Sequence, residues 1–187
     1  MRYPNLTAEY EASGYHISVL AEHANTSKEH MQETLYGDQE LLLHEFCALY
    51  GLFSDFGNYR HYQMSYLASP KLSAVDPATN KGRYQTVILR EKLTRIPESE
   101  LTDSRHVNRY HQAQRVLAAL EEGRAVKYAF YRRALLDLDS IRYWLQRRSS
   151  RMEYQEGAKA DKAPQKGKRK WTTLLNFIQP MMNRKPR

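Results

Sequence analysis

Cysteine is almost absent from this chain, since Cys47 is the only one among 187 residues. A single cysteine excludes an internal disulfide and a thiolate zinc cluster, so a reducing compartment suits the protein. Apolar neighbours predict that Cys47 is a small core residue. The sequence also lacks a run of about 18 apolar residues, and its start has no apolar stretch of the kind a secretory signal needs. We therefore expect a cytoplasmic protein that makes no membrane contact.

Motifs of catalysis and metal binding are missing as well. The chain has no glycine-rich phosphate loop, no GxSxG elbow, no paired acidic motif and no HExxH pattern. His16 and His23 are separated by about 10.5 Å of helical rise, which is too far for one metal ion. His106 and His111 point to different sides of their helix. We expect no enzyme, no cofactor and no metal site.

Charge is distributed unevenly along the sequence. The whole chain has a net charge of +8. Residues 1–67, which we call the head, hold three basic and nine acidic side chains, a net charge of −6. The rest of the chain holds 26 basic and 12 acidic side chains, a net charge of +14. An acidic head and a basic remainder need not contact the same partner, and the basic part is typical of nucleic-acid binding.

The head is predicted to form four short helices. The first runs roughly from Leu6 to Ala12 and ends at Gly14, because glycine readily takes the left-handed conformation that ends helices. The third begins at a cap formed by Thr26 or Ser27 and ends at Gly37. Apolar spacing gives three buried stripes, on the second, third and fourth helices: Ile17, Leu20, Ala21 and Ala24; then Met31 and Leu35; then Leu43, Phe46, Cys47 and Tyr50.

Beyond the head we expect a linker over residues 68–83, a helical body over 84–148 and a basic tail over 149–187, in an all-α fold. Two prolines and a final glycine disfavour any regular element in the linker. Residues 84–93 fit a helix or a strand, and we predict a helix. Two apolar faces mark the body: Ala113, Val116, Leu117 and Leu120; and Phe130, Ala134, Leu138, Ile141 and Leu145.

Gly123 leaves two arrangements of the body open. A turn at this glycine folds the body into a helical hairpin, whereas one long helix passes through it at a cost of about 1 kcal/mol. Cations alternate with aromatic rings over residues 127–133 and 142–148. Such a surface stacks bases and tracks a nucleic-acid backbone, but the same pattern describes half-buried tyrosines covered by arginines.

The tail combines charged and small residues, so we expect disorder from Ser149 to Lys170. Four of its cations form a basic arm that suits a phosphate backbone: Lys166, Lys168, Arg169 and Lys170. A solvated tail without a partner is the alternative. The short amphipathic segment 171–178 follows this arm.

The head resembles the lambda-repressor-like, or XRE-type, helix-turn-helix family of phage and mobile-element regulators. The resemblance covers about a third of the chain and rests on spacing more than on any single residue. The residues that carry it are Tyr3-Pro4-Asn5-Leu6, Gly14, Leu20-Ala21-Glu22, Thr26-Ser27, Met31, Leu35, Gly37 and Glu45. Ala21 stands where that fold needs a small side chain, and Met31 and Leu35 stand where it buries the recognition helix.

This resemblance implies that the third helix enters the major groove of double-stranded DNA. By position, four side chains are the DNA-binding candidates: Ser27, Lys28, His30 and Gln32. Lys28 and Gln32 suit guanine or adenine edges. Glu29 and Glu33 also face the groove, where phosphates repel a carboxylate unless it accepts a hydrogen bond from cytosine.

Three further positions depart from the family pattern. His16 replaces a threonine or serine cap, Ile17 replaces a phosphate-binding polar residue, and Asn25 replaces the turn glycine. A head at −6 needs charge from the basic body to hold phosphates. The alternative is that the helix-turn-helix serves as a dimerisation or protein-docking module.

The sequence thus predicts a non-enzymatic, homodimeric DNA-binding regulator of phage or mobile-element type. A second hypothesis is an inhibitor of a defence nuclease, because the chain also resembles anti-CRISPR proteins that join a helix-turn-helix domain to a module that binds the effector complex. An acidic head then occupies a site built for nucleic acid. A third is a helical protein-interaction module.

Overall fold

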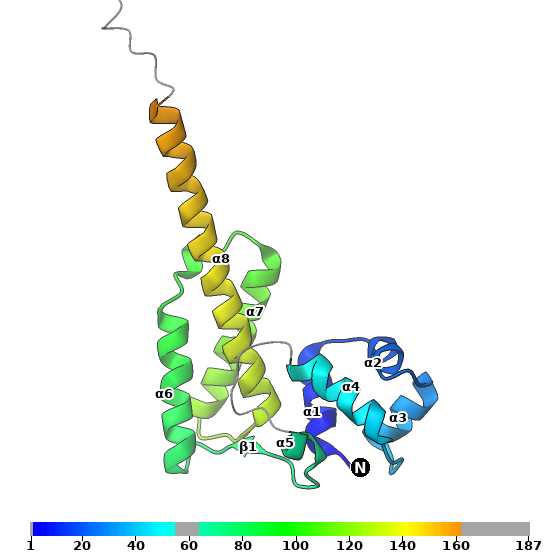
Figure 1. The fold of residues 1–187 in the computed structure, drawn as a ribbon. Coiled ribbons are helices and arrows are strands. Elements are labelled where there is room, and N and C mark those ends of the chain that lie inside the picture. Colours follow the sequence, from blue (N-terminus) through cyan, green and yellow to red (C-terminus); the bar gives the residue numbers. More distant parts are fainter. Residues whose placement is uncertain (1, 55–63, 162–187) are drawn as a thin grey trace, which may run out of the picture. The chain divides into compact units, whose positions relative to one another are not determined.

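The computed structural model describes residues 2–54 and 64–161 of the chain, with side chains as far as Arg151. The fold is all-α, as predicted, apart from one pair of two-residue strands (Figure 1). Residues 1–145 make up one compact unit, and the chain from Gln146 onward belongs to a second. The candidate sites described below all lie in the first unit.

The head begins with three helices at the predicted places. They are α1 (Pro4–Ser13), α2 (Ile17–His23) and α3 (Lys28–Tyr36). Gly14 ends α1 with a φ of +69°, the left-handed conformation that the sequence predicted. The predicted stripes of the second and third helices are buried except for Ile17, which is half-buried, and Leu20, Met31 and Leu35 are fully enclosed in one apolar cluster.

The predicted buried face of the fourth helix is correct only in part. Helix α4 (Leu43–Ser54) buries Leu49 and Phe53, and the predicted Phe46 and Tyr50 are half-buried against the same cluster. The assignments of Leu43, which is 78% exposed, and of Cys47, which is exposed, were wrong. The predicted stripe left out Glu45, which is only 3% exposed in the structure. A buried carboxylate needs hydrogen-bond partners, and those partners fix how α4 rotates on the core. Helix α5 (Met64–Ala68) follows.

The segment predicted to lack regular structure also departs from expectation. It contains strand β1 (Ala74–Val75), which pairs antiparallel with strand β2 (Val126–Lys127). The segment is tied to the head as well, because the Asn5 side chain accepts a hydrogen bond from the Ser73 N–H at 2.8 Å and donates to the carbonyl oxygens of Tyr66 and Lys71. Local patterns do not reveal such long-range partners.

The body is a helical arrangement built on a second apolar cluster. It contains α6 (Asn80–Thr94), a 3₁₀ turn (Glu98–Glu100), α7 (Ser104–Glu121) and α8 (Tyr128–Asp161). The helix predicted over 84–93 is confirmed as part of α6. Gly123 has a φ of +81°, and the chain reverses there between α7 and α8, so the hairpin alternative is correct.

Helix α8 continues past the point where the sequence predicted disorder. It includes residues 149–161, where runs of Arg, Met, Gln, Glu and Ala favour helix even without apolar spacing. The disorder expected over 162–170, the basic arm and the segment 171–178 lie outside the described residues.

Oppositely charged groups of the head and the body meet directly. Arg132 of α8 forms a bidentate ion pair with Glu9 of α1, with Nε to Oε1 at 3.0 Å and Nη2 to Oε2 at 2.5 Å. Both side chains are at most 5% exposed. Lys127 reaches Glu11 at 2.7 Å nearby. Part of the charge imbalance between head and body is therefore neutralised inside the molecule.

Candidate nucleic-acid interface

A tight turn at Asn25 joins the two consecutive helices α2 and α3. Asn25 is the only non-glycine residue with positive φ in the described part of the chain, at 54°. Asparagine tolerates this conformation better than most non-glycine residues, so the turn does not need a glycine here. The turn closes with a hydrogen bond of 2.9 Å from the Thr26 N–H to the Ala21 carbonyl oxygen.

Local capping fixes where both helices begin. The Ser27 hydroxyl accepts the His30 N–H at 3.0 Å and caps α3, which settles the choice between Thr26 and Ser27. His16 Nδ1 accepts the Ser18 N–H and caps α2. The imidazole therefore does here what a serine or threonine hydroxyl does at other helix starts.

The predicted DNA-binding residues lie on or next to the solvent-facing side of α3. Met31 and Leu35 anchor the opposite side and are fully buried. Lys28 and Gln32 are four residues apart, share one face and are exposed. Ser27 is exposed as well, but its side-chain oxygen is engaged in the cap. The body does not cover this edge.

His30 has a different environment from the other candidates. It is half-buried, and its Nε2 lies 3.2 Å from a carboxylate oxygen of Glu45. Glu45 also accepts the Leu42 N–H at 2.8 Å and a hydrogen bond from Thr26. One carboxylate thus joins the turn, the first part of α3 and the start of α4. His30 acts within this network, which positions Lys28 and Gln32.

The Glu45 network predicts a pH-dependent contribution to stability. Burial favours the protonated acid, but hydrogen bonds from Leu42, Thr26 and His30 outweigh it and hold the pKa of Glu45 below its usual value of 4.5. A lowered folded-state pKa stabilises the fold above that value, and the contribution is lost as pH falls through the folded-state pKa. We expect Glu45→Gln to lower the free energy of unfolding by about 2 kcal/mol near neutral pH.

Urea denaturation at a series of pH values measures this effect. The difference between the two proteins should shrink as the pH drops below 4.5. Glu40→Gln, which removes an exposed carboxylate paired with Arg2, is the control and should change little. A Glu45→Gln penalty that does not vary with pH contradicts the assignment.

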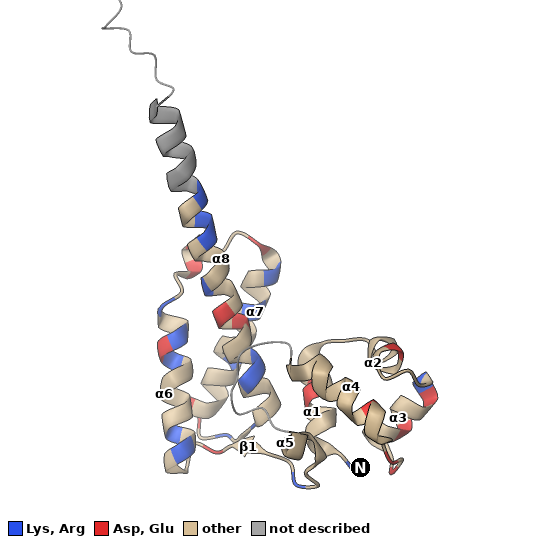
Figure 2. Ribbon diagram, in the orientation of Figure 1, with Lys and Arg blue, Asp and Glu red and all other residues tan. Residues whose placement is uncertain are grey.

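The edge of α3 carries more negative than positive charge. Glu29 and Glu33 are exposed one helical turn apart, and Glu22 at the end of α2 is exposed too. Within the described ranges, none of these three carboxylates has an ion-pair partner. Figure 2 shows acidic residues on the α2 and α3 part of the head and many cations on α6, α7 and α8. Lys28 is the one cation of α3.

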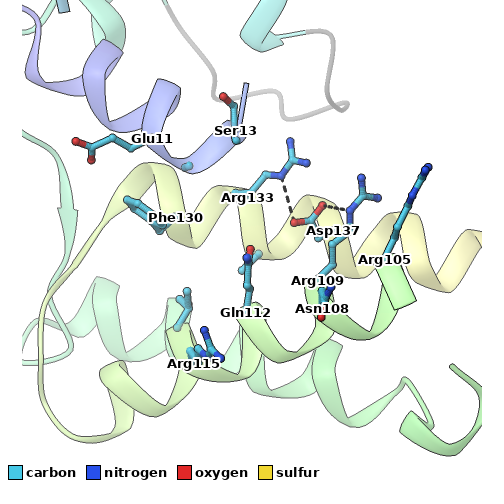
Figure 3. Close-up of a pocket in the computed structure, with 14 residues that line it drawn as sticks. Glu11, Ser13, Arg105, Asn108, Arg109, Gln112, Arg115, Phe130, Arg133 and Asp137 are labelled. Carbon is cyan, nitrogen blue, oxygen red and sulfur yellow. Dashed lines mark hydrogen bonds and ion pairs between the residues drawn. The ribbon is translucent and has the colours of Figure 1, made fainter. Parts of the chain in front are cut away.

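A second candidate site is an open cleft of about 590 Å³ between the end of α1 and helices α7 and α8. Figure 3 shows the guanidinium groups of Arg133, Arg109 and Arg105 following one another along the two helices. Arg115 lines the other end. Phe130 adds an aromatic ring to the wall. We call this site the arginine cleft.

Asp137 is a buried carboxylate that pairs with two arginines of the cleft. Its two carboxylate oxygens lie 3.2 Å from Arg133 Nε and 3.5 Å from Arg109 Nε, and the side chain is 7% exposed. Burial raises the pKa of Asp137 above its usual value, and the two guanidinium groups oppose that rise. The carboxylate holds two arginines in fixed positions without cancelling the charge of the cleft.

Sequence reasoning missed the arginine cleft. Arg133 belonged to the alternating cation and aromatic pattern, yet its neighbour Arg132 is buried in an ion pair and Tyr131 is only 3% exposed. The stretch is therefore neither a continuous base-stacking surface nor simply a row of half-buried tyrosines covered by arginines. One signal was available: Arg105, Arg109 and Gln112 recur at helical spacing on the polar face of α7.

Some functional classes find no support in the described part of the chain. Residues 2–54 and 64–151 contain no group of His, Cys, Asp and Glu side chains arranged to hold a metal ion. No helix among them combines the length and apolar character needed to cross a membrane. Comparison with protein-family models, curated proteins and solved structures finds no match.

Proposed function

We propose that the protein is a non-enzymatic helix-turn-helix regulator that binds double-stranded DNA through α3. The observation that carries this proposal is the anchoring of α3: Met31 and Leu35 are buried while Lys28 and Gln32 stand exposed on the opposite edge. A helix held in this way presents its first turns to base edges in the major groove. The capped start of α3 and the left-handed turn at Asn25 support this proposal, because they fix where α3 begins.

The charge of the head limits how such binding works. Phosphate neutralisation supplies most of the non-specific affinity for DNA, and the exposed edge has Lys28 against Glu29 and Glu33. We infer that base reading by α3 is combined with phosphate contacts from the basic body and the arm at Lys166, Lys168, Arg169 and Lys170. A homodimer suits this role, since two half-sites double the contact.

Selection from a random duplex library tests the proposal without knowledge of an operator. The full chain is expected to enrich a defined sequence, and Gln32→Ala should reduce discrimination at one position about tenfold. If Lys28 contacts a base, Lys28→Ala should weaken the base preference at another position of the selected DNA sequence. If Lys28 contacts a phosphate, the variant should lower the salt dependence of binding by about one phosphate contact. Sedimentation of the DNA complex measures whether two chains bind.

The control for these variants is Arg83→Ala, an exposed change at the start of α6 far from α3 in the sequence. It should leave both the enriched sequence and its ranking unchanged. Enrichment of no sequence, or wild-type specificity in Lys28→Ala and Gln32→Ala together, contradicts base reading by α3.

One observation favours a second candidate function. Glu22, Glu29 and Glu33 form an exposed acidic edge that has no ion pair within the described residues, which suits docking to a basic surface. In that case the protein inhibits a nucleic-acid-binding partner, such as a guide-loaded defence nuclease, by occupying its cationic site. Inhibition that disappears in Glu29→Lys/Glu33→Lys favours this candidate, whereas DNA binding that strengthens in the same variant favours the regulator.

A further inference from the structure

We propose that the arginine cleft binds a phosphorylated small molecule of nucleotide size. This inference concerns a different surface from α3 and stands whether or not α3 reads DNA. It rests on the charge of the cleft, on its shape and on the way its cations are held.

The charge of the cleft is positive after internal pairing. Four arginines line it, and two carboxylates oppose them. Glu11 is already paired with Lys127 at 2.7 Å, and Asp137 is shared between Arg109 and Arg133. Arg105 and Arg115 have no ion-pair partner in the described part of the chain. An anion that enters the cleft therefore meets a surplus of guanidinium groups.

The positions of the arginines favour phosphate over a single carboxylate. Arg105 and Arg109 lie one helical turn apart on α7, and Arg133 approaches them from α8 (Figure 3). Guanidinium groups donate several parallel hydrogen bonds, and a phosphate group accepts them through three oxygens. Because Asp137 holds two of the arginines in place, less conformational entropy is lost when the anion binds.

The rest of the cleft fits a larger organic group. A volume of about 590 Å³ lies within the range of small-molecule sites. Phe130, Val116 and Ala134 form an apolar wall, while the amides of Asn108 and Gln112 can donate and accept hydrogen bonds. A nucleotide-sized ligand can pack its flat ring against Phe130, place the polar edge of the ring near these amides and bind the arginines through its phosphate.

Isothermal titration calorimetry of the full chain with AMP, CMP, GMP and UMP tests the proposal, with adenosine as the unphosphorylated control. At least one monophosphate should bind, and adenosine should bind at least tenfold more weakly. Arg105→Gln is the main variant, because Arg105 makes no ion pair in the described part of the chain. We expect it to weaken binding about tenfold.

Two further variants distinguish binding at the arginine cleft from non-specific attraction to the net positive charge of the protein. Asp137→Asn removes the carboxylate that holds Arg109 and Arg133 in place and should weaken monophosphate binding, provided that circular dichroism shows an unchanged fold. Arg142→Gln removes an exposed cation from the same helix outside the cleft and should leave affinity unchanged. Equal losses in Arg105→Gln and Arg142→Gln overturn the proposal, because binding is then a property of net charge.

Nucleic acid is the competing source of phosphate. A short single strand and a duplex are therefore titrated beside the monophosphates. If no monophosphate binds while Arg105→Gln weakens oligonucleotide binding, the cleft contacts a nucleic-acid backbone and the small-molecule proposal is wrong. Monophosphate binding that is lost in Arg105→Gln supports it even if α3 binds no DNA.

Discussion

Replacing Arg132 with alanine is expected to lower the free energy of unfolding by about 3–5 kcal/mol, the largest single effect we predict. The substitution leaves the Glu9 carboxylate buried without its bidentate partner. It also removes the donors that lie 3.3 Å from the Phe53 carbonyl oxygen. Since α1 and α8 meet at this pair, the loss affects both apolar clusters. Urea denaturation followed by circular dichroism measures it.

A double variant separates the cost of an unpaired charge from the value of the pair. Glu9→Leu/Arg132→Met replaces both partners with apolar side chains, and buried pairs are often replaced in this way with little loss. We expect the double variant to be more stable than Arg132→Ala. Arg90→Ala is the matched control, because it breaks an Arg–Glu pair that is 53% and 42% exposed, and it should cost little. A similar small loss in Arg132→Ala refutes the prediction.

Adding one methyl group to Gly82 is expected to cost about 3 kcal/mol. A Cβ at this position would stand 1.8 Å from the Asp76 carbonyl oxygen and 2.4 Å from its carbon. The neighbour is backbone and cannot rotate away, so the turn before α6 must move. Differential scanning calorimetry of Gly82→Ala should show a clearly lowered Tm.

The chain supplies a matched control of opposite sign. Gly51 also lies within a helix, but a Cβ there meets no atom of the described residues within 4 Å. Alanine favours helix over glycine, so Gly51→Ala should raise stability by about 0.5–1 kcal/mol. If both substitutions change Tm in the same direction, the close approach of the Asp76 backbone is not the reason why position 82 is a glycine.

The sequence predicted well what local chemistry controls. Gly14 ends α1 as predicted, Ser27 at the start of α3 is one of the two caps that were predicted, and the turn at Gly123 is one of the two alternatives left open. Each of these residues acts on its own few neighbours, which is why local patterns reveal it. Apolar spacing also identified Met31 and Leu35, because α3 buries one continuous stripe. The all-α fold follows from the same two signals.

Other features depend on residues that are distant in the chain. Glu45 is buried because His30 and Leu42 supply partners, which apolar spacing does not reveal. The strand at Ala74–Val75 exists because Val126 and Lys127 lie beside it. The arginine cleft is lined by residues of α1, α7 and α8, so it cannot be predicted from any single stretch of sequence. Long-range pairing of this kind is what pattern reading cannot supply.

The ion pair between Glu9 and Arg132 joins residues that are 123 positions apart. A chain emerging from the ribosome presents its amino-terminal part first, at roughly 5–20 residues per second. Glu9 therefore stays hydrated for several seconds until the helix that carries its guanidinium partner has been made. The contacts of α1 with α3, such as the hydrogen bond from Thr7 to the Leu35 carbonyl oxygen, need only the head. The attachment of α1 to α8 is therefore a late step, and translation speed through the intervening stretch sets how long the Glu9 carboxylate stays unpaired.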